Sequence, residues 1–154
     1  MRTHKIRILY IDDEIHNLNT FKANFRRDYE ITACGSCEEG RRILKEKDFE
    51  IIITDQRMPV MTGVEFLESI VAEFPDPLRI ILTGYSDLEL VVDSVNKGRV
   101  HYYLTKPWED EELRLYIEKA YEFYSLKKRN KQLITDLTNV NHKIESMLRK
   151  NSFD

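Results

Sequence analysis

Five short runs of β-branched and other apolar residues recur along the first 104 residues, and polar residues follow most of them. The runs cover residues 6–11, 30–33, 49–54, 78–83 and 101–104. Apolar runs of this length, bounded by turn-forming residues, are typical of buried strands. The third run is almost wholly apolar, as expected of a central parallel strand whose two faces are both covered. The interval after each run is long enough to hold one helix.

Three of these intervals begin with a pattern that marks the start of a helix. The pattern is a serine or threonine followed three positions later by glutamate, and it occurs at Ser36, Thr62 and Ser86. In such a capping box the hydroxyl and the carboxylate satisfy the free amide groups of the first turn. Strands that alternate with helices, joined by right-handed crossovers, predict an α/β fold. We therefore expect a doubly wound, five-stranded parallel sheet with helices on both faces.

Polar residues stand at the carboxyl ends of four predicted strands. Asp12 and Asp13 follow the first, Asp55 follows the third, Thr83 ends the fourth and Lys106 follows the fifth. Ligands of open parallel sheets bind outside this edge. Three carboxylates there repel one another unless a cation neutralises them, and Mg²⁺ accepts such oxygen ligands together with phosphate. A lysine and a hydroxyl beside them suit phosphoryl oxygens. These residues predict phosphoryl transfer to a carboxylate.

At these positions the sequence resembles the receiver domain of bacterial two-component response regulators, over about residues 4–125. The resemblance places the acidic pair, the phosphoacceptor, the switch hydroxyl, the switch aromatic and the Lys-Pro pair at Asp12 and Asp13, Asp55, Thr83, Tyr103, and Lys106-Pro107. It implies the flavodoxin-like receiver fold. The sequence of residues 55–59 and 98–108 looks most like that of receivers attached to hydrogenase-type transcription activators or to cyclic-di-GMP phosphodiesterases.

The resemblance also implies a mechanism and a partner. A sensor histidine kinase would donate a phosphoryl group to Asp55, and the chain would catalyse only its own phosphorylation and autodephosphorylation. Mg²⁺ would be held by Asp12, Asp13, Asp55 and the carbonyl of Arg57. Lys106 and Thr83 would then contact the phosphoryl group while Tyr103 turns inward, changing the surface of the fourth helix, fifth strand and fifth helix. Arg57 and Tyr85 either screen the acyl phosphate from water or are solvated.

Two other functions fit parts of the pattern. A dimeric interaction module could keep these residues without using them, and it would bind its partner whether or not Asp55 is modified. A metal-dependent phosphohydrolase is disfavoured, because Arg57 stands where aspartyl-phosphate phosphatases need a second acid two residues after the nucleophile. Cys34 and Cys37 form a C-x-x-C pattern. The parallel βα pattern lacks the antiparallel half of a thioredoxin fold, which disfavours a redox pair.

A long helix is predicted after Pro107, because no proline or glycine follows it up to Arg149. Five residues at helical spacing should pack on the sheet: Leu113, Tyr116, Ile117, Ala120 and Tyr124. Beyond them the apolar spacing alternates between three and four residues and forms a heptad seam: Phe123, Leu126, Asn130, Leu133, Leu137, Val140, Ile144 and Met147. In this register Asn130 takes an a position, which favours a parallel two-stranded coil.

We therefore expect a receiver domain over residues 1–125, a coiled-coil extension over residues 126–154, and a parallel homodimer. Alternatively, the amphipathic helix folds back on its own receiver or leads to a downstream effector. The seam is only three and a half heptads long, and Ile134 and Leu148 at e positions blur it.

Composition limits the cellular compartment and the binding partners to be expected. Residues 1–126 carry 17 Lys and Arg against 24 Asp and Glu, whereas residues 127–154 carry seven against three. An acidic body gives no electrostatic footprint for nucleic acid, and a short basic run is typical of a solvated helix face. No apolar stretch approaches the roughly 20 residues that span a bilayer, and the apolar run at the start is too short for a secretory signal. Two cysteines agree with a reducing compartment. We expect a cytoplasmic protein.

Overall fold

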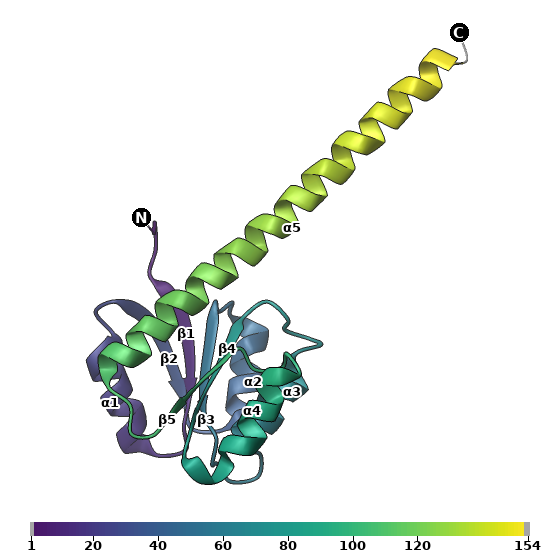
Figure 1. Ribbon diagram of the computed structural model, residues 1–154. Coiled ribbons are helices and arrows are strands. Elements are labelled where there is room, and N and C mark those ends of the chain that lie inside the picture. The colour runs from purple at the N-terminus through teal and green to yellow at the C-terminus, as the bar shows by residue number, and fades with distance from the viewer. Residues whose placement is uncertain (1, 153–154) are drawn as a thin grey trace.

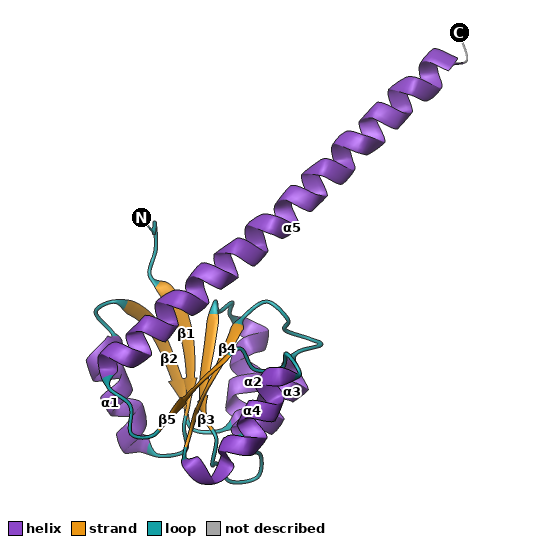
Figure 2. Cartoon of the chain, viewed as in Figure 1, coloured by secondary structure: helices purple, strands orange, loops and turns teal. Residues whose placement is uncertain are grey.

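The computed structural model describes residues 2–152 and contains the five predicted strands. They are β1 (Ile6–Ile11), β2 (Tyr29–Cys34), β3 (Ile51–Asp55), β4 (Leu78–Thr83) and β5 (Tyr102–Thr105). The helices are α1 (Ile15–Phe25), α2 (Cys37–Glu46), α3 (Gly63–Ile70), α4 (Leu88–Asn96) and α5 (Asp110–Ser152), with a single 3₁₀ turn, η1 (Tyr85–Asp87), before α4. Strands and helices alternate as predicted (Figure 2).

All strand pairs are parallel, and the strand order is β2-β1-β3-β4-β5. Helices α1 and α5 cover one face of the sheet, and α2, α3 and α4 cover the other (Figure 1). Every residue of β3 and β4 is buried, because both faces of these strands carry helices. The doubly wound fold is confirmed. The strand order changes direction between β1 and β3. Ligands of open parallel sheets bind in the crevice outside the carboxyl ends of the strands at such a point.

The helix starts agree with the sequence at two of three places. Thr62 caps α3 in a full capping box with Glu65. Ser36 caps α2 by accepting a hydrogen bond from the Glu39 amide, although the Glu39 carboxylate is bonded to the amide of Gly35. The prediction at Ser86 is wrong.

Helix α4 begins two residues after Ser86, and η1 occupies the predicted start. The N-cap residue of α4, Asp87, makes no side-chain capping bond. Both Ser86 and Asp87 instead bind the side chain of Arg57. A long-range ion pair has therefore replaced the local cap.

Helix α5 has the predicted length and packing, although it begins at Asp110 rather than directly after Pro107. Leu113, Ile117 and Ala120 are fully buried against the sheet, with Tyr116 and Tyr124 packed beside them. The helix then leaves the domain and continues as a single rod (Figure 1). At 1.5 Å per residue it is about 65 Å long. Among residues 2–152, no helix is both long and apolar enough to cross a membrane.

The glycine that opens α3 is required by its neighbours. A Cβ at Gly63 would overlap the backbone carbonyl oxygen of Asp55, and the Gly63 amide donates a hydrogen bond to the Gln56 carbonyl. The overlap is with backbone, which cannot rotate away as a side chain can. Gly84 is a matched contrast, because a Cβ there meets nothing within 4 Å and the residue has an ordinary negative φ.

We predict that Gly63→Ala lowers the free energy of unfolding by about 1–3 kcal/mol, the usual cost of overpacking a filled site. Gly84→Ala should change it by less than about 0.5 kcal/mol. Urea denaturation followed by circular dichroism measures both. Equal effects of the two substitutions would show that the close approach of α3 to β3 does not constrain position 63.

Candidate functional site

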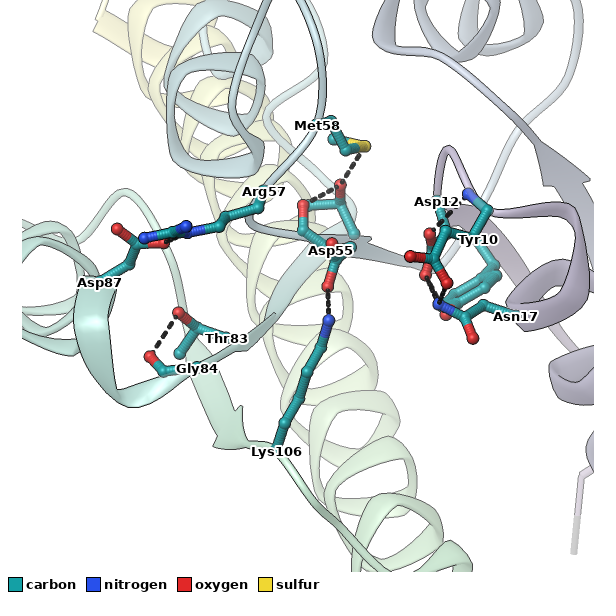
Figure 3. A network of polar contacts seen from close by, with 12 residues as sticks. Tyr10, Asp12, Asn17, Asp55, Arg57, Met58, Thr83, Gly84, Asp87 and Lys106 are labelled. Carbon is teal, nitrogen blue, oxygen red and sulfur yellow. Dashed lines mark hydrogen bonds and ion pairs between the residues drawn. The ribbon is translucent and has the colours of Figure 1, made fainter.

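The carboxyl ends of four strands bring the predicted polar residues together at one edge of the sheet (Figure 3). Asp12 and Asp13 follow β1, Asp55 is the last residue of β3, and Thr83 is the last residue of β4. Lys106 follows β5, where it precedes a cis peptide bond to Pro107. The chain thus builds the site from segments that are more than 90 residues apart in sequence.

The three aspartates form a tight acidic cluster. One carboxylate oxygen from each of Asp12, Asp13 and Asp55 lies within 4.8 Å of the others. Asp12 and Asp55 are buried, whereas Asp13 is exposed. Hard oxygen donors with one solvent-facing side fit Mg²⁺, which keeps several waters and binds through few carboxylates. The residues present therefore fit this cation.

Asp55 is held between opposing charges. It is only 5% exposed, and its Oδ1 atom forms an ion pair with the ammonium group of Lys106 (Figure 3). Burial raises the pKa of Asp55 above its usual value, the Lys106 charge acts against this, and Asp12 and Asp13 raise it further. The carboxylate therefore has a lysine on one side and repelling carboxylates on the other.

Asp12 is fixed by donors that the sequence analysis did not single out. Its Oδ2 atom accepts hydrogen bonds from the Tyr10 hydroxyl at 3.0 Å and from the Asn17 side-chain amide at 3.1 Å. Its Oδ1 atom accepts a bond from the Glu14 amide at 3.0 Å. The available signal was a tyrosine two positions before Asp12, since residues i and i+2 point to the same side of an extended chain.

The remaining predicted residues lie near the cluster without touching it through their side chains. The buried Thr83 hydroxyl donates to the carbonyl of Gly84 at 3.1 Å. Tyr103 is half-buried and packs against the core on the α2, α3 and α4 side of the sheet. The Arg57 side chain is directed to η1, where it pairs with Asp87 at 2.9 Å and bonds to Ser86 at 3.0 Å. Tyr85 is exposed.

The C-x-x-C pair is built into the core. Cys34 and Cys37 are free thiols, and both are buried. Burial raises the pKa of Cys34 to about 12 and that of Cys37 to about 11. A redox-active thiol needs a lowered pKa, so these environments are those of structural cysteines.

The family model of the response regulator receiver domain matches residues 8–118 of the chain. The chain belongs to this family. Receiver domains are signalling domains that a partner kinase phosphorylates, and they generally bind Mg²⁺ through acidic residues such as the cluster described above. The chain carries both the fold and the acidic edge of the family.

Two similar curated proteins are hydrogenase transcriptional regulatory proteins named HoxA. The protein from Bradyrhizobium diazoefficiens is 33% identical over 121 residues, and the protein from Cupriavidus necator is 31% identical over 119 residues. The matches cover 79% and 77% of this chain and 25% of each relative. The chain thus spans about a quarter of the length of these relatives. They belong to the transcription-activator class that the sequence resembled.

Solved structures support the same fold. A crystal structure described as adenylate cyclase from Rhodopirellula baltica has a TM-score of 0.83 and 33% identity, covering 86% of this chain and 98% of that chain. The signal receiver domain of an HD domain-containing protein from Pseudomonas fluorescens Pf-5 has a TM-score of 0.77 and 27% identity, covering 84% and 96%. Receiver domains of this shape therefore occur in proteins whose descriptions differ.

We predict that Asp55→Asn raises the unfolding temperature at pH 7 in the presence of a chelator. The raised pKa of Asp55 means that its ionised form opposes folding, and the neutral amide removes that cost while keeping the shape. The advantage of the variant should shrink as the pH falls through the raised pKa, because the wild-type carboxyl then takes up a proton. Added Mg²⁺ should also shrink it. Thermal unfolding at several pH values measures this, and a less stable variant at pH 7 would contradict it.

Proposed function

We propose that this chain is a response regulator switch that accepts a phosphoryl group on Asp55 from a sensor histidine kinase. The observation that carries the proposal is the buried Asp55 carboxylate, which is paired with Lys106 and flanked by two further aspartates at the carboxyl edge of a receiver fold. A carboxylate in this position can act as a nucleophile. The adjacent ammonium group of Lys106 can pair with the negative charge of the incoming phosphoryl group.

In the proposed reaction, a carboxylate oxygen of Asp55 attacks the phosphorus of a phosphohistidine. A phosphorus–oxygen bond forms and the phosphorus–nitrogen bond breaks, and the imidazole leaves with the electron pair. The product is an acyl phosphate on Asp55. Lys106, which is paired with the Asp55 carboxylate, would then pair with a phosphoryl oxygen.

Asp12, Asp13, Asp55 and the backbone carbonyl of Arg57 would hold Mg²⁺ at this edge. When bound, the cation offsets negative charge on the transferring group. Asp12 and Asp55 are buried and Asp13 faces solvent, so the cluster is open on one side to phosphate. The side chain of Arg57 is engaged with Asp87, so its proposed contact with the cation is through the backbone carbonyl.

The response would begin at Thr83 and Tyr103. The Thr83 hydroxyl bonds only to the adjacent Gly84 carbonyl among residues 2–152, so little is lost when it turns to a phosphoryl oxygen. Tyr103 would turn inward into the space that Thr83 vacates. These shifts would alter the surface formed by α4, β5 and α5. Arg57 and Tyr85 are the residues that could screen the acyl phosphate from water. The ion pair of Arg57 with Asp87 connects the loop after β3 to η1.

The output element of the proposal is a parallel homodimer through residues 126–154, with the receiver over residues 1–125. Residue 1 and residues 153–154 of these ranges lie outside the described residues. The apolar seam residues from Phe123 to Met147 are between 43% and 64% exposed in the single chain. Burying one such side chain contributes about 1.5–3 kcal/mol, so a second copy of the seam is a favourable partner. Asn130 at an a position supports the parallel arrangement.

The continuous course of α5 from Asp110 to Ser152 supports a helix that leaves the receiver over one that folds back on it. An exposed ion pair between Lys131 and Asp76 at 3.0 Å joins this part of α5 to the domain. Leu133, Leu137 and Val140 lie beyond it and are exposed. An effector that continues from α5 is compatible with the dimer, and the activity of such an effector would be the output.

We predict that acetyl phosphate adds one phosphoryl group to the wild-type chain, in an Mg²⁺-dependent reaction, as measured by intact-mass spectrometry. Asp55→Asn should show no addition, because it removes the nucleophile. Asp93→Asn is a matched control that changes an exposed aspartate of α4 outside the acidic cluster, and it should accept the phosphoryl group as wild type does. Equal acceptance by Asp55→Asn and wild type would refute the assignment and favour a phosphorylation-independent interaction module.

We predict that the chain is dimeric and that the pair of substitutions Leu133→Lys and Leu137→Lys makes it monomeric. Each change places a charge in the apolar seam, and together they should weaken the dimer by at least a hundredfold. Gln132→Lys with Asn139→Lys adds the same charge at outward c positions and should leave the dimer intact. Sedimentation analysis across concentrations separates these outcomes. A wild-type chain that is monomeric at all concentrations would remove the coil from the proposal.

A further inference from the structure

The Asp12 carboxylate is held by three hydrogen-bond donors from three parts of the chain. They are the Tyr10 hydroxyl of β1, the backbone amide of Glu14, and the side-chain amide of Asn17 in α1. Asp12 is 1% exposed, so water contributes little to its solvation. The orientation of this carboxylate within the cluster therefore depends on these donors.

Tyr10 is the most firmly fixed of the side chains that hold Asp12. It is 1% exposed, and its ring is stacked on Phe21 of α1 with centroids 4.0 Å apart and planes within 2° of parallel. Asp12 directly follows β1, and side chains two residues apart in extended chain point to the same side, so Tyr10 and Asp12 lie on the same side of the sheet. The hydroxyl is thus aimed along the strand at Asp12 Oδ2, and Figure 3 shows the two groups together.

The Tyr10 hydroxyl acts as a donor in this contact. A phenolic O–H donates, and an ionised carboxylate oxygen can only accept, so the proton of this hydrogen bond comes from the tyrosine. Asn17 also contacts Glu14, at 3.2 Å, so it divides its amide between two carboxylates, whereas the Tyr10 hydroxyl donates to Asp12.

We propose that Tyr10 is a positioning residue for the divalent cation, acting through Asp12. The hydroxyl holds the Asp12 carboxylate close to Asp13 and Asp55 despite their mutual repulsion, so less freedom is lost when a cation binds. The residue at position 10 is then a determinant of Mg²⁺ affinity and does not touch the phosphoryl group. This inference rests on the proposed function of the acidic cluster.

A purely structural role for Tyr10 predicts something different. Its ring belongs to the core cluster between the sheet, α1 and α5, and a core residue affects stability without a specific effect on the cation. Tyr10→Phe keeps the stacked ring and removes only the hydroxyl. Tyr29→Phe is a matched control, because Tyr29 is equally buried in the same core and its hydroxyl bonds to Glu118 at 3.0 Å, outside the acidic cluster.

The test is an isothermal calorimetric titration of the full chain with Mg²⁺ alone at pH 7, which gives the Kd for the cation. Tyr10→Phe should raise the Kd about tenfold, within the range found when outer hydrogen bonds to metal ligands are removed. Tyr29→Phe should leave it within about twofold of wild type. In an Asp12→Asn background, Tyr10→Phe should have no further effect on the Kd. Asn17→Ala removes the second donor to the same oxygen and should also weaken binding.

The phosphorylation rate supplies a readout that a structural defect would not reproduce. With acetyl phosphate, Tyr10→Phe should be slow at low Mg²⁺ and should recover the wild-type rate at saturating Mg²⁺. An unchanged or lower Kd, or the same rate deficit at all Mg²⁺ concentrations, would overturn the inference. Asp13→Asn separates this failure from that of the proposed site: if Mg²⁺ binds Asp13→Asn as tightly as wild type, the acidic cluster itself is not the cation site.

Discussion

Three carboxylates that repel one another are held together at the edge of this sheet, and one lysine faces them. The backbones that carry Asp12, Asp13 and Asp55 are kept close because β1 and β3 are paired over four residues in the centre of the sheet. Both strands are buried beneath helices on both faces. The apolar packing of the core therefore maintains an unfavourable charge arrangement that a bound cation would relieve.

Lys106 balances the cluster from the other side and also connects it to the long helix. It follows β5 directly, and α5 begins four residues later at Asp110. The buried residues Leu113, Ile117 and Ala120 then tie α5 to the face of the sheet that carries Tyr10. The same helix continues into the exposed seam, whose first member, Phe123, has its ring 6.0 Å from that of His101. One element thus runs from the proposed phosphorylation edge to the proposed dimer contact.

The strands, the doubly wound sheet, the long helix and the positions of the strand-end residues could be predicted from the sequence. Each of these follows from local patterns: apolar runs of strand length, and polar residues placed at their carboxyl ends. The start of α4 could not be predicted in this way. Ser86 fits a capping box locally, but Arg57, which is 29 positions away, binds it in the folded chain.

The support of Asp12 by Tyr10 was missed for a related reason. A tyrosine in a strand is usually an ordinary core aromatic, and its polar end becomes informative only when its partner is known. The exposure of the seam is the third such case, because a heptad pattern does not say whether the helix folds back on its own domain. The extended course of α5 beyond Lys131 required the three-dimensional arrangement.

In the proposed function, Asp55 is the residue that becomes an acyl phosphate. Borohydride reduces an acyl phosphate of aspartate to homoserine, and this product can be located by peptide mass spectrometry after treatment with acetyl phosphate and Mg²⁺. We expect homoserine at position 55 and at no other aspartate, and none should form when a chelator replaces Mg²⁺. Homoserine at Asp12 or Asp13, or its absence from position 55 in a chain that carries the phosphoryl group, would contradict it.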